Sequence, residues 1–550
     1  MRRVWIVAGL VVAVAAGAVG YQLAKNWKQY HYAGTRLKAD LGRPDALIRT
    51  ASLSQLPRDF LKVPIARDVL TEDLVYYYEQ GEDRLGLNGA LKRIAYEHDL
   101  DWTDRLLVSI FNEPAELALW RDGKGALRNY ALVVRRNALA KVLQEAASVA
   151  LKDSQLSAAG EIETPAGTAK VYALTLNPRR TLLLISQGDR LVVLSDPGLL
   201  FDNGNKVVAE AQEAVAQWLT SDGTLSRQFA LDDGAPPAAG TGKPTHTVAI
   251  GAPALSLGYG AFMPGFRGLR FDFGSTWSTS VWVEPAALPK TGLGDAALWK
   301  AVPANPSACV VLPLDWNAAQ KVVTEARNKP NLGEGANLAA LSGSALACWY
   351  GESTLYSPVF VVKIAAGLGD RKASLQALAN WAIAQRDAKG GKTGPATIAE
   401  KGGVMQWRSA TPVAADVLAQ HPKVLPAALA ARGDYVAFSP DGALVDLVLA
   451  TLARANPSVA DQMPAGDGTL ALITPRRLSP MAEQEALAAL SDGDDTSLRD
   501  VAQAKLPSHM KALAAYPPYR LELPAPGKPL FGNAASGWQR VEWRTKEDAK

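Results

Sequence analysis

One order of secondary-structure signals runs through this chain twice, and this repetition constrains the fold more than any single motif. The clearest copy is a glycine-aspartate turn, an apolar strand and a second turn, at 188–198 and again at 433–442. A helical pattern follows each copy, at 206–219 and at 443–455. Because two turn residues between apolar runs are typical of a β-hairpin, we predict the same hairpin-and-helix unit in both halves.

Further landmarks keep the same order in both halves. Amphipathic helix patterns lie at 139–150 and 375–382, and Leu-Ala-Leu-Trp ending at Trp120 matches Leu-Ala-Cys-Trp ending at Trp349. Each half closes with two tryptophans five residues apart: Trp277 with Trp282, and Trp538 with Trp543. The repetition predicts an α+β chain of two similar modules, each a mostly antiparallel sheet with amphipathic helices. Trp120 should then superpose on Trp349, and Trp277 on Trp538.

The N-terminus has the pattern of a membrane segment. Arg2 and Arg3 precede an uncharged apolar run at 4–24, whose length matches the roughly 20 residues that cross a bilayer. A cleaved signal peptide is the alternative, with small-residue cleavage sites at 13–18; the length of the run favours an uncleaved anchor. The basic N-terminus predicts that this end lies in the cytoplasm and that the rest of the chain is exported.

These features predict the organisation of the whole chain. In order, we expect a signal anchor or transmembrane helix at 1–30, a juxtamembrane linker at 31–46, the first α+β module at 47–288, the second at 289–544, and a tail at 545–550. No other segment reaches 18 uninterrupted apolar residues, the approximate minimum for a span, so we expect only one.

Charge and cysteine content narrow the choice of partners and compartment. The chain has 58 basic and 54 acidic residues without a concentrated basic stripe, so we expect no nucleic-acid partner. Its two cysteines, Cys309 and Cys348, lie in strand-like segments. In an oxidising compartment they could pair, and a bridge across about 39 residues would stabilise the fold by ~4 kcal/mol. Two separate buried thiols are the alternative.

No pattern assigns a catalytic residue, a cofactor site or a metal site. A zinc site requires clustered ligands, and none of the five histidines has another within helical or hairpin spacing: His31, His98, His246, His421 and His509. The segment 390–393 lacks the earlier glycine of a phosphate loop, and 492–496 lacks the final glutamate of a calcium loop. Ser342-Gly343-Ser344 and Lys363 could be interpreted as a serine–lysine arrangement, but Ser344 aligns with a region where the first half has Pro114 or Ala115. Asp189 and Asp434 are interpreted as turn residues.

Three segments carry a resemblance to a known family. They are Asp40-Leu41-Gly42-Arg43-Pro44-Asp45-Ala46-Leu47, Leu53-Ser54-Gln55-Leu56-Pro57-Arg58-Asp59 and Gly81-Glu82-Asp83-Arg84-Leu85-Gly86-Leu87. With the topology above, they make the chain resemble the YfaA-like proteins, a bacterial family of unknown function, along nearly its full length. The resemblance implies a proteobacterial inner-membrane protein with a periplasmic domain. Such proteins tend to be encoded near α2-macroglobulin-like protease traps, which implies an accessory role beside one.

We therefore expect a membrane-anchored periplasmic protein without enzymatic activity, which binds or scaffolds an envelope partner, such as a macroglobulin-like protease trap. Two packed modules would offer a large surface and a cleft where partners bind. One alternative is a periplasmic hydrolase with an unrecognised site, using the acidic and aromatic stretch 83–102. Another is a lipid or cell-wall ligand binder, which would require a continuous apolar groove.

Overall fold

The structure is a computed structural model that describes residues 30–63, 113–135, 156–231, 244–326, 338–462 and 468–545, with gaps at 54, 61, 123–126, 178–179, 257–259, 274–276, 289–295, 352, 388–396, 410–412, 415–423, 490–495 and 524–536. The expected anchor at 4–24 and the stretch 83–102 lie outside the described residues. Within them, no helix is both long and apolar enough to cross a membrane.

The chain divides into two compact units. Of the described residues, those in 30–59, 113–231 and 244–249 form the first unit, and those in 60–63 and 250–545 form the second. The sequence predicts another boundary, between residues 288 and 289, which would separate the two copies of the repeat. That boundary stays a prediction. In the linker expected at 31–46, residues 31–45 contain no helix or strand, and Ala46 begins β1. Hydrogen bonds nevertheless join this segment to the first unit, because the Tyr32 amide donates to Asn205 Oδ1 and the Trp120 indole donates to the Asp40 carbonyl.

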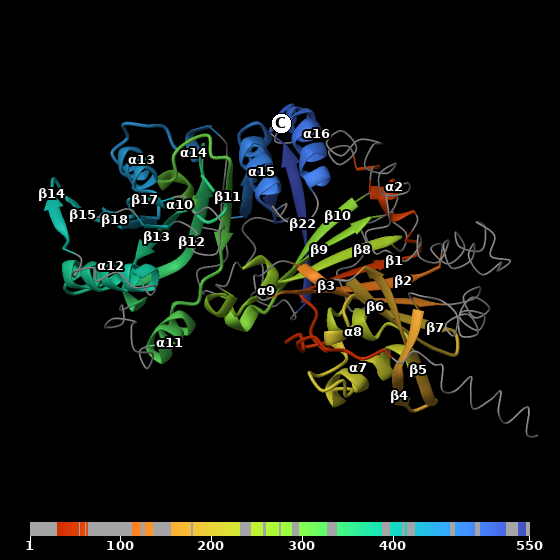
Figure 1. The fold of residues 1–550 in the computed structure, drawn as a ribbon. Coiled ribbons are helices and arrows are strands. Elements are labelled where there is room, and N and C mark those ends of the chain that lie inside the picture. The colour runs from red at the N-terminus through yellow and green to blue at the C-terminus, as the bar shows by residue number, and fades with distance from the viewer. Residues whose placement is uncertain are drawn as a thin grey trace, which may run out of the picture. The chain divides into compact units, whose positions relative to one another are not determined.

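The first unit is built on a sheet whose strands follow the order β8-β1-β2-β3-β7-β6-β5-β4 (Figure 1). Every pairing from β1 to β4 is antiparallel. The elements are β1 (Ala46–Thr50), α2 (Leu56–Phe60), β2 (Ala115–Arg121), β3 (Leu127–Arg135), β4 (Leu156–Thr164), β5 (Gly167–Asn177), β6 (Arg180–Gln187), β7 (Arg190–Leu194), η1 (Pro197–Leu199), α7 (Ala209–Thr220), α8 (Thr224–Gln228) and β8 (His246–Gly251).

The second unit is built on an antiparallel sheet in the order β9-β10-β22-β21-β20-β11-β12-β13-β19-β18-β15-β14. Its strands are β9 (Phe266–Phe273), β10 (Trp277–Val283), β11 (Ala308–Leu312), β12 (Leu341–Trp349), β13 (Val359–Ile364), β14 (Ala399–Lys401), β15 (Val404–Arg408), β18 (Ala428–Arg432), β19 (Tyr435–Ser439), β20 (Thr469–Ile473), β21 (Tyr519–Glu522) and β22 (Gly537–Thr545), with a separate pair β16 (Val413–Ala414) and β17 (Val424–Leu425).

Helices cover both faces of the central strands in the second unit. They are α9 (Ala252–Leu255), η2 (Gly260–Phe262), η3 (Pro285–Ala287), α10 (Ala296–Ala301), α11 (Trp316–Ala326), η4 (Leu338–Ala340), α12 (Arg371–Asp387), α13 (Gly442–Leu452), α14 (Val459–Gln462), α15 (Pro475–Ala489) and α16 (Thr496–Ala514). One core joins Val445 of α13 to Leu346 and Val361; the opposite core joins Leu375 of α12 to Val362. Adjacent residues of one strand are thus both buried, as two-sided coverage requires.

Two-residue turns close the hairpins β6–β7 and β18–β19, as the sequence predicts. They are Gly188-Asp189 and Gly433-Asp434. The glycines have φ of 56° and 57°, a conformation that only glycine adopts without steric cost. The two aspartates are therefore confirmed as turn residues. Helices α7 and α13 then follow, which confirms the predicted helical patterns.

The strand order of the first unit recurs in the second. The order β8-β1-β2-β3-β7-β6-β5-β4 corresponds to β20-β11-β12-β13-β19-β18-β15-β14, with α7 and α13 at the same point of the chain. The tryptophans do not correspond. Trp120 contacts Trp218 of α7, whereas Trp349 packs against Met481 of α15, on the face opposite α13.

The closing tryptophans do not correspond either. Trp277 and Trp538 lie on the adjacent paired strands β10 and β22, but the residue opposite Trp538 is Trp282. Since successive side chains alternate between faces, Trp277 and Trp538 point to opposite faces. Both superpositions expected from the sequence are therefore wrong at the level of single residues, because a shift of one residue exchanges the faces of a strand.

Candidate functional site

A hollow of about 540 Å³ opens in the second unit beside the loop at 303–305. Its buried floor includes Tyr350 and Leu444. Its rim includes Leu447, which is 39% exposed although large and apolar. The hollow is also lined by Pro303, Asn305, Ser353, Asp441, Asn456, Pro457 and Arg477. The volume is within the range of ligand pockets, ~300–1,000 Å³.

Backbone hydrogen bonds hold the two loops that flank the hollow. Pro303 and Ser458 form an isolated antiparallel bridge. The Ala304 amide donates to the Pro457 carbonyl over 2.9 Å, and the Val459 amide donates to Val302 over 2.9 Å. Because both loops are anchored to the core in this way, the wall of the hollow is preformed.

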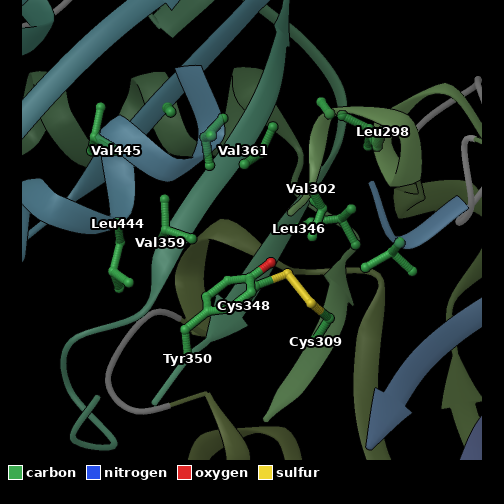
Figure 2. Packing of buried hydrophobic residues seen from close by; sticks show 14 of the residues in the cluster. Leu298, Val302, Cys309, Leu346, Cys348, Tyr350, Val359, Val361, Leu444 and Val445 are labelled. Atoms are coloured by element: carbon green, nitrogen blue, oxygen red, sulfur yellow. A yellow bond between two sulfur atoms is a disulfide. The ribbon is translucent and has the colours of Figure 1, made fainter. Parts of the chain in front are cut away.

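The disulfide between Cys309 and Cys348 lies next to the floor of the hollow. The two residues are directly opposite each other on β11 and β12, with Cα atoms 4.1 Å apart and both side chains fully buried. Figure 2 shows Tyr350 beside the sulfur pair, with Leu444 and Val359 packed around it. The bridge therefore ties β11, which follows the 303–305 loop, to β12, which ends at Trp349 immediately before Tyr350.

The polar groups around the hollow already have structural partners. The Tyr350 hydroxyl donates to the Pro303 carbonyl over 2.8 Å, and burial raises the pKa of Tyr350 well above its usual range. Ser353 Oγ accepts from the Tyr350 amide, and Asp441 caps α13 by accepting from the Ala443 amide. The hydrogen bonds of Tyr350, Ser353 and Asp441 therefore hold the walls of the hollow in place.

A second hollow of about 520 Å³ shares Asn305 with the first. Its walls include Pro306, Val459, Leu472 and Pro518. Asn305 is exposed and has φ of 57°, which asparagine tolerates better than most residues. The 303–306 loop thus lines two hollows in the same unit.

The first unit contains a buried hydrogen-bonded chain that sequence reasoning missed. His246 Nε2 lies 2.8 Å from Asp59 Oδ2, and its Nδ1 lies 2.7 Å from Thr50 Oγ1. The Thr50 hydroxyl donates to the Ser52 carbonyl and accepts from the Ser52 amide. Which of His246 Nδ1 and Thr50 Oγ1 is the donor depends on the tautomer of His246. These hydrogen bonds join β1, α2 and β8.

The sequence matches, over residues 4–543, the model of a family described as an uncharacterized protein conserved in bacteria (DUF2138). The chain belongs to this family. The uncharacterized protein YfaA of Escherichia coli (strain K12) is 29% identical to it over 530 residues, which are 92% of this chain and 91% of that protein. The predicted resemblance to YfaA-like proteins is therefore confirmed. No solved structure matches.

The other candidates of this DUF2138 chain do not assemble into a site. Ser342 is opposite Lys363 on β12 and β13, but its hydroxyl donates to the Ile364 carbonyl over 3.4 Å. His98 and His421 lie outside the described residues. Among the residues that the structure does describe, no three His, Cys, Asp or Glu side chains are placed to hold a metal ion. The contact between His246 and Asp59 was not predicted, because the two residues are 187 positions apart in the sequence. The one sequence signal in this region was the segment of the family resemblance that ends at Asp59.

Proposed function

We propose that this chain is a membrane-anchored protein of the bacterial envelope that binds a polypeptide partner and catalyses no reaction. The observation that carries this proposal is the hollow at Tyr350. It is open, its walls combine apolar side chains with amides, and its hydroxyl and carboxylate groups are bonded to the backbone. Preformed pockets of this composition hold ligands through shape and a few polar contacts.

The compartment is part of the same proposal. The uncharged run at 4–24 after Arg2 and Arg3 supports an inner-membrane anchor with a cytoplasmic N-terminus. The bonded pair Cys309–Cys348 supports exposure of the folded part to the oxidising periplasm. Protease added to spheroplasts should digest the folded part; full protection of the chain would contradict this orientation.

The duplication of an α+β module is also proposed here, with modules at 47–288 and 289–544. The common strand order of the two units supports it, because identical connections in one order rarely arise twice independently. An experimental structure in which β18 and β19 did not occupy the places of β6 and β7 would overturn it. Two related modules with different surfaces can each bind a partner, and this arrangement fits a scaffold better than it fits an enzyme with one active site.

The partner in this proposal is a protein segment that offers an apolar side chain and the hydrogen-bonding groups of its backbone. Leu447 offers apolar contact at the rim, and the side-chain amides of Asn305 and Asn456 can exchange hydrogen bonds with a peptide backbone. Asp441 and Arg477 contribute one charge of each sign, so the hollow as a whole favours neither an acidic nor a basic segment. A macroglobulin-like protease trap is the first candidate for this partner.

The test is capture of partners by the tagged full-length chain after crosslinking in its native host, with mass spectrometry of the products. Leu447→Gln is compared with Leu255→Gln, because Leu255 is similarly exposed at 37% but does not line the hollow. We expect one recurrent envelope protein with the wild type and with Leu255→Gln, and at least a tenfold loss with Leu447→Gln. Equal capture by both variants, or no partner, would overturn the proposal.

A further inference from the structure

One face of the four strands β9, β10, β22 and β21 in the second unit is polar. Figure 1 shows β9, β10 and β22 side by side, and their register places Arg270, Ser280 and Arg540 in line across them. The intervening residues, among them Val281 and Val541, point to the other face and belong to an apolar core. This polar face shares no residue with the hollow at Tyr350.

Arginines and carboxylates on this face pair almost completely. Arg270 is paired with Asp272, Arg520 with Glu522, and Arg544 with Glu522 and Glu542. Arg540 differs from the others. Within the part of the chain that the structure describes, its guanidinium has no ion pair, and this sets it apart from Arg270, Arg520 and Arg544. Its Nε is also buried without a hydrogen-bond acceptor, as is the Nε of Arg520, whose guanidinium is paired with Glu522. One positive charge on this face therefore remains unbalanced.

A second donor without an acceptor lies close to Arg540. The indole N–H of Trp282 is buried and unbonded, and its ring lies 5.3 Å from the ring of Trp538. Trp282 is opposite Trp538, and Arg540 follows Trp538 by two residues on the same face. Diagonal neighbours of this kind are ~7–8 Å apart at the backbone, within reach of long side chains. Both donors can therefore reach one ligand group.

An N–H that is buried without an acceptor destabilises the folded protein, so two of them on neighbouring strands call for a ligand. Arginine pairs with carboxylate and phosphate through charge-assisted hydrogen bonds. We propose that Arg540 and Trp282 bind a single oxyanion, a carboxylate or phosphate group of a ligand. Arg540 supplies the charge and its Nε–H, and Trp282 supplies the indole N–H.

The neighbouring charges limit what the site accepts. The carboxylates of Glu522 and Glu542 are held by Arg520 and Arg544, and they repel any second negative group. The side chains of Arg544 and Glu542 are 38% and 36% exposed, so a ligand can approach from this end of β22. The site therefore selects one oxyanion on an otherwise neutral ligand.

The test is isothermal titration of the full-length chain at low ionic strength, where surface charge is least screened. Inorganic phosphate is the probe in one arm and butyrate, which has a single carboxylate, is the probe in the other, which distinguishes the two sources of the oxyanion. The variants are Arg540→Gln and Trp282→Phe. The control is Arg432→Gln, on β18 of the same unit, whose guanidinium donates to the Leu449 carbonyl.

We expect saturable binding of one probe by the wild type and by Arg432→Gln. Arg540→Gln should bind at least tenfold more weakly, and Trp282→Phe, which keeps an aromatic ring but lacks the N–H, a few-fold more weakly. Absence of binding in both arms, or unchanged affinity in Arg540→Gln, overturns the proposal. If Arg540→Gln does not fold, unchanged affinity in Trp282→Phe overturns it alone. Neither result depends on the partner expected at the hollow.

Discussion

Individual hydrogen bonds explain why residues far apart in the sequence are needed together. His246 is fully buried, and both of its ring nitrogens have partners, Thr50 and Asp59. Because a buried polar atom without a partner costs more than a bond contributes, loss of any one member should be felt by the others. The three residues come from β1, α2 and β8, so they hold these elements of the first unit together.

Thr50→Val should lower the free energy of unfolding of the first unit by about 1–3 kcal/mol, because it leaves the buried Nδ1 of His246 without its hydrogen-bond partner. The measurement is urea unfolding followed by hydrogen exchange of the amides of β1 and β8. Thr168→Val is the matched control, since its exposed hydroxyl lies 3.4 Å from Glu163 and its loss should change stability by less than about 0.5 kcal/mol. Equal effects of the two substitutions would contradict the role given to Thr50.

Tyr350 predicts a pH dependence of the second unit. Burial raises its pKa well above the ordinary value of 10.0, so the folded protein keeps the phenol proton at a pH where the unfolded chain loses it. The stability contributed by the neutral phenol is therefore full below pH 10 and is lost as pH rises above it. Tyr350→Phe cannot titrate, and its unfolding free energy should fall less steeply above pH 10 than that of the wild type. Identical slopes in urea titrations at increasing pH would refute this.

Single elements were the part of the fold that the sequence predicted best. The Gly-Asp hairpins and helices α7 and α13 are local, because turn chemistry and apolar periodicity decide them. The apolar period also places Leu375 and Leu378 of α12 in the core, as confirmed. Pairing of Cys309 with Cys348 was one of two open alternatives, since geometry between strands is not visible in a sequence.

The candidate sites could not be predicted from the sequence, because each depends on how distant strands pair. Asp59 and His246 meet only because β1 and β8 are paired. The position of Trp282 and Arg540 as diagonal neighbours on one face depends on the register between β10 and β22. The sequence gives neither the pairing of distant strands nor its register, and an error of one residue in register reverses the face, as it did for Trp120 and Trp349.

The disulfide gives a prediction at the level of paired strands. It joins β11 to β12 across 39 residues, and a loop of this length should stabilise the second unit by about 4 kcal/mol. Dithiothreitol should therefore lower the urea midpoint of the wild type. The double variant Cys309→Ala with Cys348→Ala is the control, and its midpoint should not respond to the reductant. A wild-type midpoint that is insensitive to full reduction would contradict the prediction.

At the scale of the whole molecule, the family match covers 4–543, which includes the apolar N-terminal run and both compact units. One family model therefore matches the N-terminal run and both units together, and a proposed function should account for all three. In the function that we propose, a membrane anchor would expose the hollow at Tyr350 and the polar face at Arg540 to envelope proteins and anionic ligands. Separate sites for separate partners are what a scaffold requires.

The most direct test of this account is photo-crosslinking in living cells from the position of Leu447. A photoreactive amino acid replaces Leu447 on α13, or Leu255 as the control, in the full-length chain expressed in its native host. The account predicts one discrete adduct with an envelope protein from position 447 and none from position 255. No adduct at 447, or the same adducts from both positions, would contradict the claim that the hollow binds a polypeptide partner.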